Sequence, residues 1–558
     1  MRRSSLVWSL CCALGLAAGA VPAQDVENSA WPSLDRQLEA DRVVSGSALQ
    51  RLIQENQDFH LLRPGEATDK IPVPPWLRVL WRKRHPVADR AGDPTGGYPH
   101  VLKEIHEWMV SHQDLLPGFT EPDVPPASHR VAVGTSERRI SSEFFTHSES
   151  DVRINVWDPS KIIAASNNIE GSGQQAEYWS TDGGQTWGET NLPLVSRDFF
   201  HSDPTVDWTS DGTAWSTTIG ITGSSNPDLR LRLYRSTDDG ATWVLDSTIA
   251  GNQTETDKQM AWIDHSATSR FVDNMYVIWH NGAPVYMNRK KLNGSWGTPI
   301  KVSGSETTGT GIGGDVKTNN AGVVFGFWPD TGSRKIYMVK STNGGQSWSK
   351  PKAVASTFDS YDIGVPAMDG RRALIYVSAA AYKAGGKDLV YVTWTDLSGA
   401  TGCRGPGNEP GSNAAAACKA RVWFTRSTNG GSTWSAKRML NNQPGKNDEL
   451  NQALTVDPVT GRLAVIYYDT AGEARTKTNV WYQSSCNGGA TWSAPFKVTS
   501  QPTDESAASA DAFNQYGDYN GLSGYARTFF PVWTDRRQGG AEQIWTAALM
   551  EPPGACVP

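Results

Sequence analysis

The sequence lacks the features by which several classes of protein are usually identified. It has no large block of basic residues, because 52 Lys and Arg are set against 58 Asp and Glu, for a formal net charge of −6. Nucleic acid is therefore not an expected partner. The chain has neither the His-Glu-x-x-His motif of zinc proteases nor the Gly-x-Ser-x-Gly elbow of many serine hydrolases, which argues against both kinds of enzyme. Beyond the N-terminus no apolar run resembles a transmembrane span.

Cysteine is scarce, and its placement is informative. The basic start Met1–Arg3 and the apolar run Leu6–Ala20 predict a secretory signal peptide over residues 1–23. We therefore expect a secreted or periplasmic protein. Two of the six cysteines lie within this segment, which leaves four, and an even number in an exported chain predicts disulfides. We expect one disulfide to join Cys403 and Cys418, which flank a Gly/Pro/Ala-rich insertion, and the other to join Cys486 and Cys556.

Residues 24–128 differ in pattern from the rest of the chain. Apolar residues recur at helical spacing in Ser47–Leu62 and again in Tyr98–Leu116, whereas Pro117–Ser128 is rich in proline. We predict a small, mainly helical N-terminal region of unknown role, joined by a Pro-rich linker to a second domain over residues 129–558.

The second domain is organised around a repeated turn motif, first seen as Ser180–Trp187 (Ser-Thr-Asp-Gly-Gly-Gln-Thr-Trp). The shared form is Ser-x-Asp/Asn-x-Gly-x-Ser/Thr-Trp. Asp or Asn can bind the backbone two residues on, Gly allows a positive φ, and Trp buries a large apolar surface between sheets. The motif therefore predicts a stabilised hairpin turn rather than a chemical site. It returns at Ser236–Trp243, Ser341–Trp348, Ser427–Trp434 and Ser485–Trp492, with a degenerate copy at Asn293–Trp296.

The spacing of these turn motifs predicts a β-propeller. Their Trp residues recur 52 to 58 residues apart, except for one interval of 86 that contains the insertion between the cysteines. Each repeat holds strand-like segments before its turn motif, the second of them rich in aromatic residues. A last unit after Trp492 has three such segments and no turn motif, and a segment near His129–Phe145 could supply its fourth strand and close the ring. We predict an all-β fold with seven blades, and six as the alternative.

The turn motif resembles the Asp-box, the repeat of bacterial neuraminidases, and the resemblance covers most of the chain after about residue 150. It implies a propeller of the sialidase-like superfamily, which in sialidases has six blades. It also implies that ligands meet the face opposite the turn motifs, where first strands begin and where second strands connect to third strands.

Carboxylates recur at these positions. Those that we expect to form a ligand-binding rim are Asp203, Asp257, Asp315, Asp518 and Asp535. The first four could together bind a cation, with calcium as the candidate because all the ligands would be oxygens. The alternative is that each Asp caps its own loop. No other cofactor is expected.

The resemblance also suggests catalytic residues. Arg153, in Val-Arg-Ile-Asn, takes the place of the first arginine of a sialidase, and Tyr519, in Tyr-Asn-Gly-Leu, resembles the nucleophile segment. Arg536 could be a second member of the arginine clamp, since its fork suits a carboxylate. The place of the acid/base Asp holds no Asp, and the third arginine has no clear counterpart. Two hypotheses follow: a glycoside hydrolase, sialidase-like, acting on exposed glycans, or a non-catalytic propeller that binds a glycan or a protein. In both cases we expect a monomer whose partner is a glycan or glycoprotein.

Overall fold

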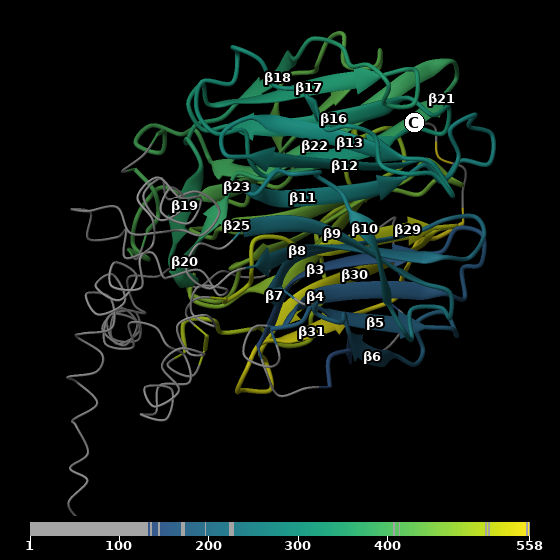
Figure 1. Ribbon diagram of the computed structural model, residues 1–558. Helices are drawn as coiled ribbons and strands as arrows, with labels where there is room; N and C mark the ends of the chain where they lie inside the picture. The colour runs from purple at the N-terminus through teal and green to yellow at the C-terminus, as the bar shows by residue number, and fades with distance from the viewer. Residues whose placement is uncertain are drawn as a thin grey trace, which may run out of the picture.

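The computed structural model describes part of the chain: residues 132–133, 137–142, 146–168, 173–195, 197–222, 228–405, 408–411, 413–507, 510–511, 514–553 and 556. The predicted signal peptide, the helical N-terminal region and the linker lie outside these residues. The described residues form strands and turns arranged as a seven-bladed β-propeller (Figure 1). None of them belongs to a helix long and apolar enough to cross a membrane.

Six blades are antiparallel sheets of four consecutive strands. Blades 1 and 2 hold β3 (His147–Ile154), β4 (Ile162–Asn168), β5 (Ala176–Ser180), β6 (Gly188–Asn191), β7 (Asp198–Trp208), β8 (Ala214–Thr222), β9 (Asp228–Ser236) and β10 (Val244–Thr248). Blades 3 and 4 hold β11 (Thr256–Ile263), β12 (Met275–Asn281), β13 (Val285–Lys290), β14 (Ile300–Lys301), β15 (Asp315–Thr318), β16 (Val324–Asp330), β17 (Lys335–Ser341) and β18 (Lys352–Ser356). Blades 5 and 6 hold β21 (Val377–Ala384), β22 (Lys387–Leu397), β23 (Ala420–Ser427), β24 (Arg438–Met439), β25 (Glu449–Val456), β26 (Leu463–Asp469), β27 (Asn479–Ser485) and β28 (Phe496–Lys497).

Blade 7 closes the ring with a strand from the other end of the domain. It consists of β29 (Gly521–Tyr525), β30 (Thr528–Asp535) and β31 (Gln543–Thr546), and its fourth strand is β2 (Arg138–Arg139). Two short strands, β32 (Leu549–Met550) and β1 (Ala132–Val133), pair with each other beside β30. Arg138 pairs with Thr546 and Arg139 with Trp545. The predicted closure and the predicted count of seven blades are confirmed.

Each turn motif joins the third strand of its blade to the fourth and packs against a neighbouring blade. In the first, the Asp182 carboxylate accepts hydrogen bonds from the backbone N–H groups of Gln185 and Thr186, at 2.8 and 2.9 Å. The Trp187 indole donates to the Gly184 carbonyl at 3.1 Å. Gly184 has a φ of +83°, and a Cβ there would lie 2.5 Å from Phe530 of blade 7. Glycine is thus required both by the turn and by contact with the preceding blade.

The core lies between the sheets and is rich in tryptophan. The largest fully buried side chains include Trp279, Trp328, Trp394 and Trp533, each from the second strand of its blade. These are the segments that the sequence marks as aromatic. Rings of this size fill the space between twisted neighbouring sheets, which explains the high Trp content.

Two features lie outside the repeat. Both predicted disulfides are present, Cys403–Cys418 in the insertion of blade 5 and Cys486–Cys556 between the last turn motif and the C-terminal tail. A two-stranded hairpin, β19 (Asp362–Val365) and β20 (Met368–Leu374), is inserted between blades 4 and 5. Figure 1 shows it at the left edge of the described structure.

Candidate functional site

The first strands of the blades surround a central channel. We call the end where these strands begin the upper mouth, and the opposite end the lower mouth. Four first strands carry a β-bulge at the upper mouth, centred on Glu149, Asp203, Lys258 and Asn451. The φ angles of these residues are +57°, +59°, +46° and +49°, a region that non-glycine residues seldom occupy. Bulges re-aim side chains, and such strain gathers at functional sites. The upper mouth is therefore the main candidate for a functional site.

Four carboxyl groups interact electrostatically there: Glu149, Asp203, Asp257 and Asp518. Burial, together with repulsion from Asp518 and Asp203, raises the pKa of Glu149 to about 8. Burial also raises the pKa of Asp203 and, with repulsion from Asp203, raises that of Asp257 well above its ordinary value. The cluster can thus hold both protonated and ionised carboxyl groups near neutral pH.

Two cations offset the charge of these acids. Arg371, on the inserted strand β20, donates to Glu149 at 3.0 Å and to Asp518. Its backbone N–H donates to the side-chain carbonyl of Gln515 at 2.8 Å, so hairpin β19–β20 is tied to the loop before blade 7. The second cation is Lys258, whose Nζ lies 3.3 Å from the ring centroid of Tyr519.

Tyr519, predicted as the nucleophile, does lie at the upper mouth. Its hydroxyl donates a hydrogen bond to the backbone carbonyl of Pro204 at 3.3 Å. Burial and the surrounding carboxylates, first among them Asp203, raise the pKa of Tyr519 well above its ordinary value. The phenol therefore stays protonated, and it donates to a carbonyl rather than to a base that could activate it.

Arg153, predicted as a catalytic arginine, lies deeper in the channel. Its Nη1 donates to Asp151 at 3.2 Å and to the Val152 carbonyl at 2.7 Å, and its guanidinium lies 5.1 Å from the Trp262 ring centroid. Asp151 also accepts the backbone N–H of Val206, in blade 2, at 3.0 Å. This part of the channel is thus tied together by ion pairs and hydrogen bonds between blades.

Asp315 follows the same pattern as Asp151 and does not join the four carboxyl groups. Lys317 donates to it at 2.5 Å, and the backbone N–H of Ala379, in blade 5, donates to it at 2.8 Å. It lines the channel and links blade 4 to blade 5. For this residue the local-capping alternative describes the structure better than a shared cation site does.

Asp535 is the last residue of β30, the second strand of blade 7, and Arg536 follows it. Arg536 donates to the carbonyls of Asp504 and Gly540, at 2.6 and 3.1 Å. Asp535 accepts from the Trp533 indole at 3.1 Å and from Arg537 Nε at 2.8 Å. Burial raises the pKa of Asp535 to about 7. These contacts fix the β30–β31 connection.

Of the rim residues that the sequence suggested, Asp203, Asp257 and Asp518 therefore come together, with Tyr519 beside them. Among the described residues, no group of three or more His, Cys, Asp or Glu side chains is arranged to hold a metal ion. Glu149, Lys258 and Arg371 were not among the predicted site residues. The sequence carried one signal for Glu149, its position two residues before Asp151 at the start of a first strand, but none for Arg371.

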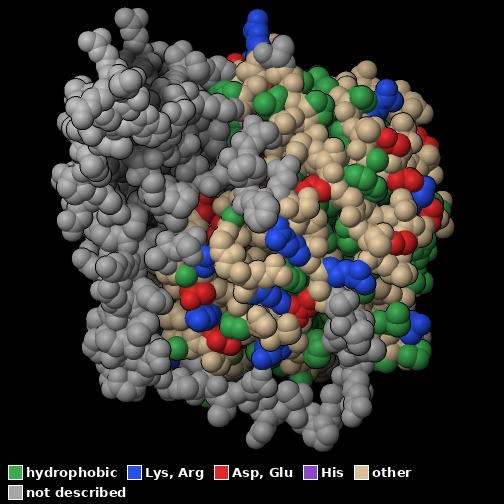
Figure 2. All heavy atoms as spheres, turned by 90° about the horizontal axis from the view of Figure 1, so that it is seen from below, with side chains coloured by type: hydrophobic (Ala, Val, Ile, Leu, Met, Phe, Trp, Pro, Cys, Tyr) green, Lys and Arg blue, Asp and Glu red, His purple; other side chains and the backbone are tan. Residues whose placement is uncertain are grey.

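Acidic and basic side chains are interspersed over the described part of the face that Figure 2 shows. This mixed surface agrees with the small net charge and offers no extended basic tract to nucleic acid.

The comparisons with known proteins concern the fold alone. No family model matches the chain, and no curated protein matches it in sequence. Similar solved structures include a protein of unknown function from Dyadobacter fermentans, with 14% identity over 77% of this chain and 100% of that chain, and a TM-score of 0.39. They also include an intramolecular trans-sialidase from Ruminococcus gnavus, with 12% identity, 61% and 92% coverage and a TM-score of 0.40. The BP39L lectin from Burkholderia pseudomallei has 11% identity, 74% and 100% coverage and a TM-score of 0.46. Similarities this low carry no argument about function.

Proposed function

We propose that the protein is an exported, monomeric propeller of the Asp-box, sialidase-like type that acts on exposed glycans at its upper mouth. The observation that carries the proposal is the gathering of Glu149, Asp203, Asp257 and Asp518 around Tyr519, with Lys258 and Arg371 as counter-charges. Titratable groups with shifted pKa values in one mouth are characteristic of functional sites. The turn motifs support the Asp-box type, and the two disulfides support an oxidising compartment.

The pKa of Glu149 favours glycoside hydrolysis. A carboxyl group with a pKa of about 8 keeps its proton at neutral pH and can donate it to a glycosidic oxygen as a general acid. Glycoside hydrolases pair such an acid with a second carboxylate, and Asp203, on the neighbouring blade, is our candidate for it. Tyr519 then serves as a wall of the site and a hydrogen-bonding group. This arrangement differs from the Tyr nucleophile that the sialidase resemblance suggests.

A second candidate function is glycan binding without turnover. The placement of the predicted catalytic residues favours it, because Arg153 lies deeper in the channel and Arg536 donates to the carbonyls of Asp504 and Gly540. Arg371 is also already bound to Glu149 and Asp518, so its charge is not held ready for a substrate carboxylate.

A screen of purified protein against chromogenic glycosides, sialosides included, separates the two candidates. For a hydrolase with Glu149 as the acid, turnover disappears in Glu149→Gln and persists in Tyr519→Phe. If turnover is lost in Tyr519→Phe and retained in Glu149→Gln, the result supports Tyr519 as the nucleophile instead. Glycan binding without turnover supports the second candidate. Neither turnover nor binding on a broad panel would overturn the proposal.

A further inference from the structure

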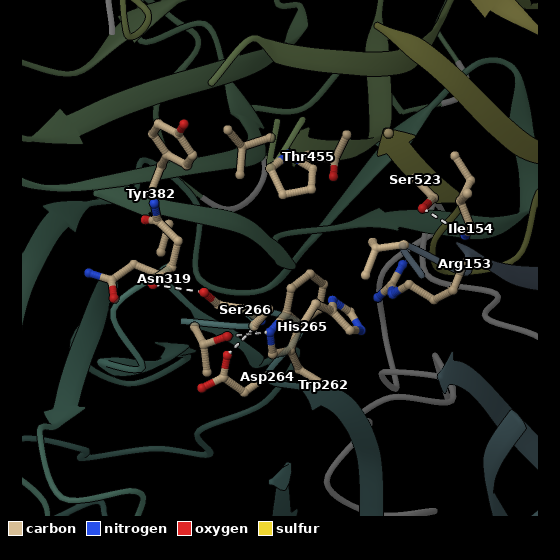
Figure 3. A pocket seen from close by; sticks show the side chains of 18 residues that line it. Arg153, Ile154, Trp262, Asp264, His265, Ser266, Asn319, Tyr382, Thr455 and Ser523 are labelled. Carbon is tan, nitrogen blue, oxygen red and sulfur yellow. Dashed lines mark hydrogen bonds between the residues drawn. The ribbon is translucent and has the colours of Figure 1, made fainter. Parts of the chain in front are cut away.

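The lower mouth of the channel contains a second hollow, at the opposite end from the proposed glycan site. It is a cavity of about 220 Å³, lined by the ends of first strands and the loops that follow them. Six of the seven blades contribute to it, all but blade 2. Ala267 and Pro458, at its rim, are exposed, so the cavity opens to the surface. Figure 3 shows the side chains that line it, with the Arg153 guanidinium pointing toward His265 and Trp262.

Several polar groups in this cavity lack partners among the residues that the structure describes. Arg153 is buried, with 6% of its surface exposed; its Nη1 donates to Asp151 and to the Val152 carbonyl, and its buried Nε has no acceptor among the described residues. The Ser523 hydroxyl accepts the Ile154 N–H at 3.0 Å and keeps its own hydrogen to donate. No hydrogen bond joins the hydroxyl of Thr455 or Tyr382 to any described residue. A buried polar group such as Arg153 Nε is seldom left unpaired unless water or a ligand completes it, whereas Thr455 and Tyr382 are partly exposed.

One wall of the cavity is aromatic and held rigidly. The Trp262 ring has Arg153 at 5.1 Å and Lys317 at 4.8 Å from its centroid. The His265 ring packs edge-on against Trp262 with centroids 4.8 Å apart, and its Nε2 lies 2.5 Å from Asp207. A fixed aromatic face beside a few convergent polar groups is the usual composition of a small-molecule site.

The charges around the cavity indicate the class of ligand. Arg153 is paired with Asp151, Lys317 with Asp315 and His265 with Asp207. The Asp264 carboxylate accepts the Ser266 N–H and the Ser269 hydroxyl. Among the described residues that line the cavity, a charged ligand would therefore find no unpaired counter-charge, and a carboxylate would meet nearby acids. A neutral ligand with several hydroxyl groups would satisfy the unpartnered donors and hydroxyls without bringing in charge.

We infer that this lower-mouth cavity binds a neutral, monosaccharide-sized polyhydroxy compound. The volume agrees, since 220 Å³ is many times the roughly 10–15 Å³ that a single water needs, and the cavity therefore has room for a small organic molecule. The inference does not depend on the proposed function of the upper mouth, because the two places share no proposed ligand-binding residue. It gives the propeller a second binding site, on the face that carries the turn motifs.

Ligand-observed saturation-transfer NMR with a panel of neutral monosaccharides tests this inference, followed by calorimetric titration of those that bind. Thr455→Phe fills the cavity from a partly exposed position without removing a hydrogen bond to a described residue. Val459→Phe is its matched control, since Val459 is exposed in the loop that follows the same strand and does not line the cavity. Tyr382→Phe removes one hydroxyl with little change of shape.

We expect Thr455→Phe to weaken monosaccharide binding at least tenfold and Val459→Phe to leave it unchanged. Tyr382→Phe should weaken it about fivefold, as the loss of one neutral hydrogen bond does. Thermal unfolding of each variant shows whether it is folded. Binding that persists in folded Thr455→Phe but disappears in Asp203→Asn would move the sugar to the upper mouth and overturn the inference. Absence of binding by every monosaccharide at millimolar concentration would also overturn it.

Discussion

Replacing Glu149 by Gln should change how the stability of the propeller depends on pH. In the unfolded chain this carboxyl has its ordinary pKa of 4.5, and in the folded protein its pKa is about 8. Between these two values the folded state keeps a proton that the unfolded state releases. The free energy of unfolding of the wild type therefore falls as the pH rises from about 4.5 to about 8. Gln does not titrate, so the variant lacks this loss.

The size of the effect follows from the same shift. At about 1.4 kcal/mol per pKa unit, a shift from 4.5 to about 8 gives an upper limit of about 5 kcal/mol. Coupling to Asp203 and Asp518 makes the real figure smaller. A domain of roughly 400 residues unfolds with an entropy of about 0.9 kcal/mol/K. The variant should thus gain at most about 5 °C in Tm over the wild type at pH 8.5, and little at pH 5.

The assay is thermal unfolding of both proteins from pH 5 to 8.5 at constant ionic strength. Glu306→Gln, in the loop between β14 and β15, is the matched control and should run parallel to the wild type. A Tm difference between Glu149→Gln and the wild type that stays constant over this range would refute the raised pKa and, with it, the role of Glu149 as an acid.

Three further results are expected. Arg371→Met removes a counter-charge from the buried acids and should lower the free energy of unfolding, measured by denaturant titration, by about 3–5 kcal/mol. The control Arg235→Met, at an exposed position, should lower it by less than about 0.5 kcal/mol. Equal effects of the two substitutions would contradict the role of Arg371 as a counter-charge. Replacing both Cys403 and Cys418 by Ser opens a loop with a sequence separation of 15 and should lower the free energy of unfolding by about 3 kcal/mol. An unchanged midpoint of the unfolding transition would show that the disulfide does not restrain the unfolded chain. Lys258 and Arg371 already offset the charge of the acids, so adding calcium to metal-free protein should leave Tm unchanged. A rise in Tm of several degrees would favour a calcium site at the upper mouth instead.

The fold could be predicted from the sequence because its determinants are local and repeated. Each turn motif contains its own hydrogen bonds, as between Asp182 and Thr186, so eight residues suffice to identify it. The period of these motifs then counts the blades, and the missing fourth strand of the last unit points to closure by β2. The disulfides followed from cysteine number and from the insertion that one pair brackets.

The candidate site could be predicted only in part because it depends on departures from the repeat. The sequence places Asp203 and Asp257 at the starts of first strands, but the bulges that turn Glu149 and Lys258 into the mouth do not alter hydrophobic periodicity. Arg371 comes from an inserted hairpin that shares no pattern with the blades. Asp315 shares the residue type of Asp203 and Asp257, but it pairs with Phe327 of β16, without a bulge, and binds Lys317 two residues later.

Glycan-array binding by the wild type, Asp203→Asn and Asp239→Asn tests most directly whether the upper mouth is the glycan site. Both aspartates have a positive φ, at 59° and 64°, which Asn tolerates, and Asp239 lies in a turn motif on the opposite face. The account predicts that the wild type and Asp239→Asn bind the same glycans and that Asp203→Asn loses them. Equal binding by all three proteins would contradict it.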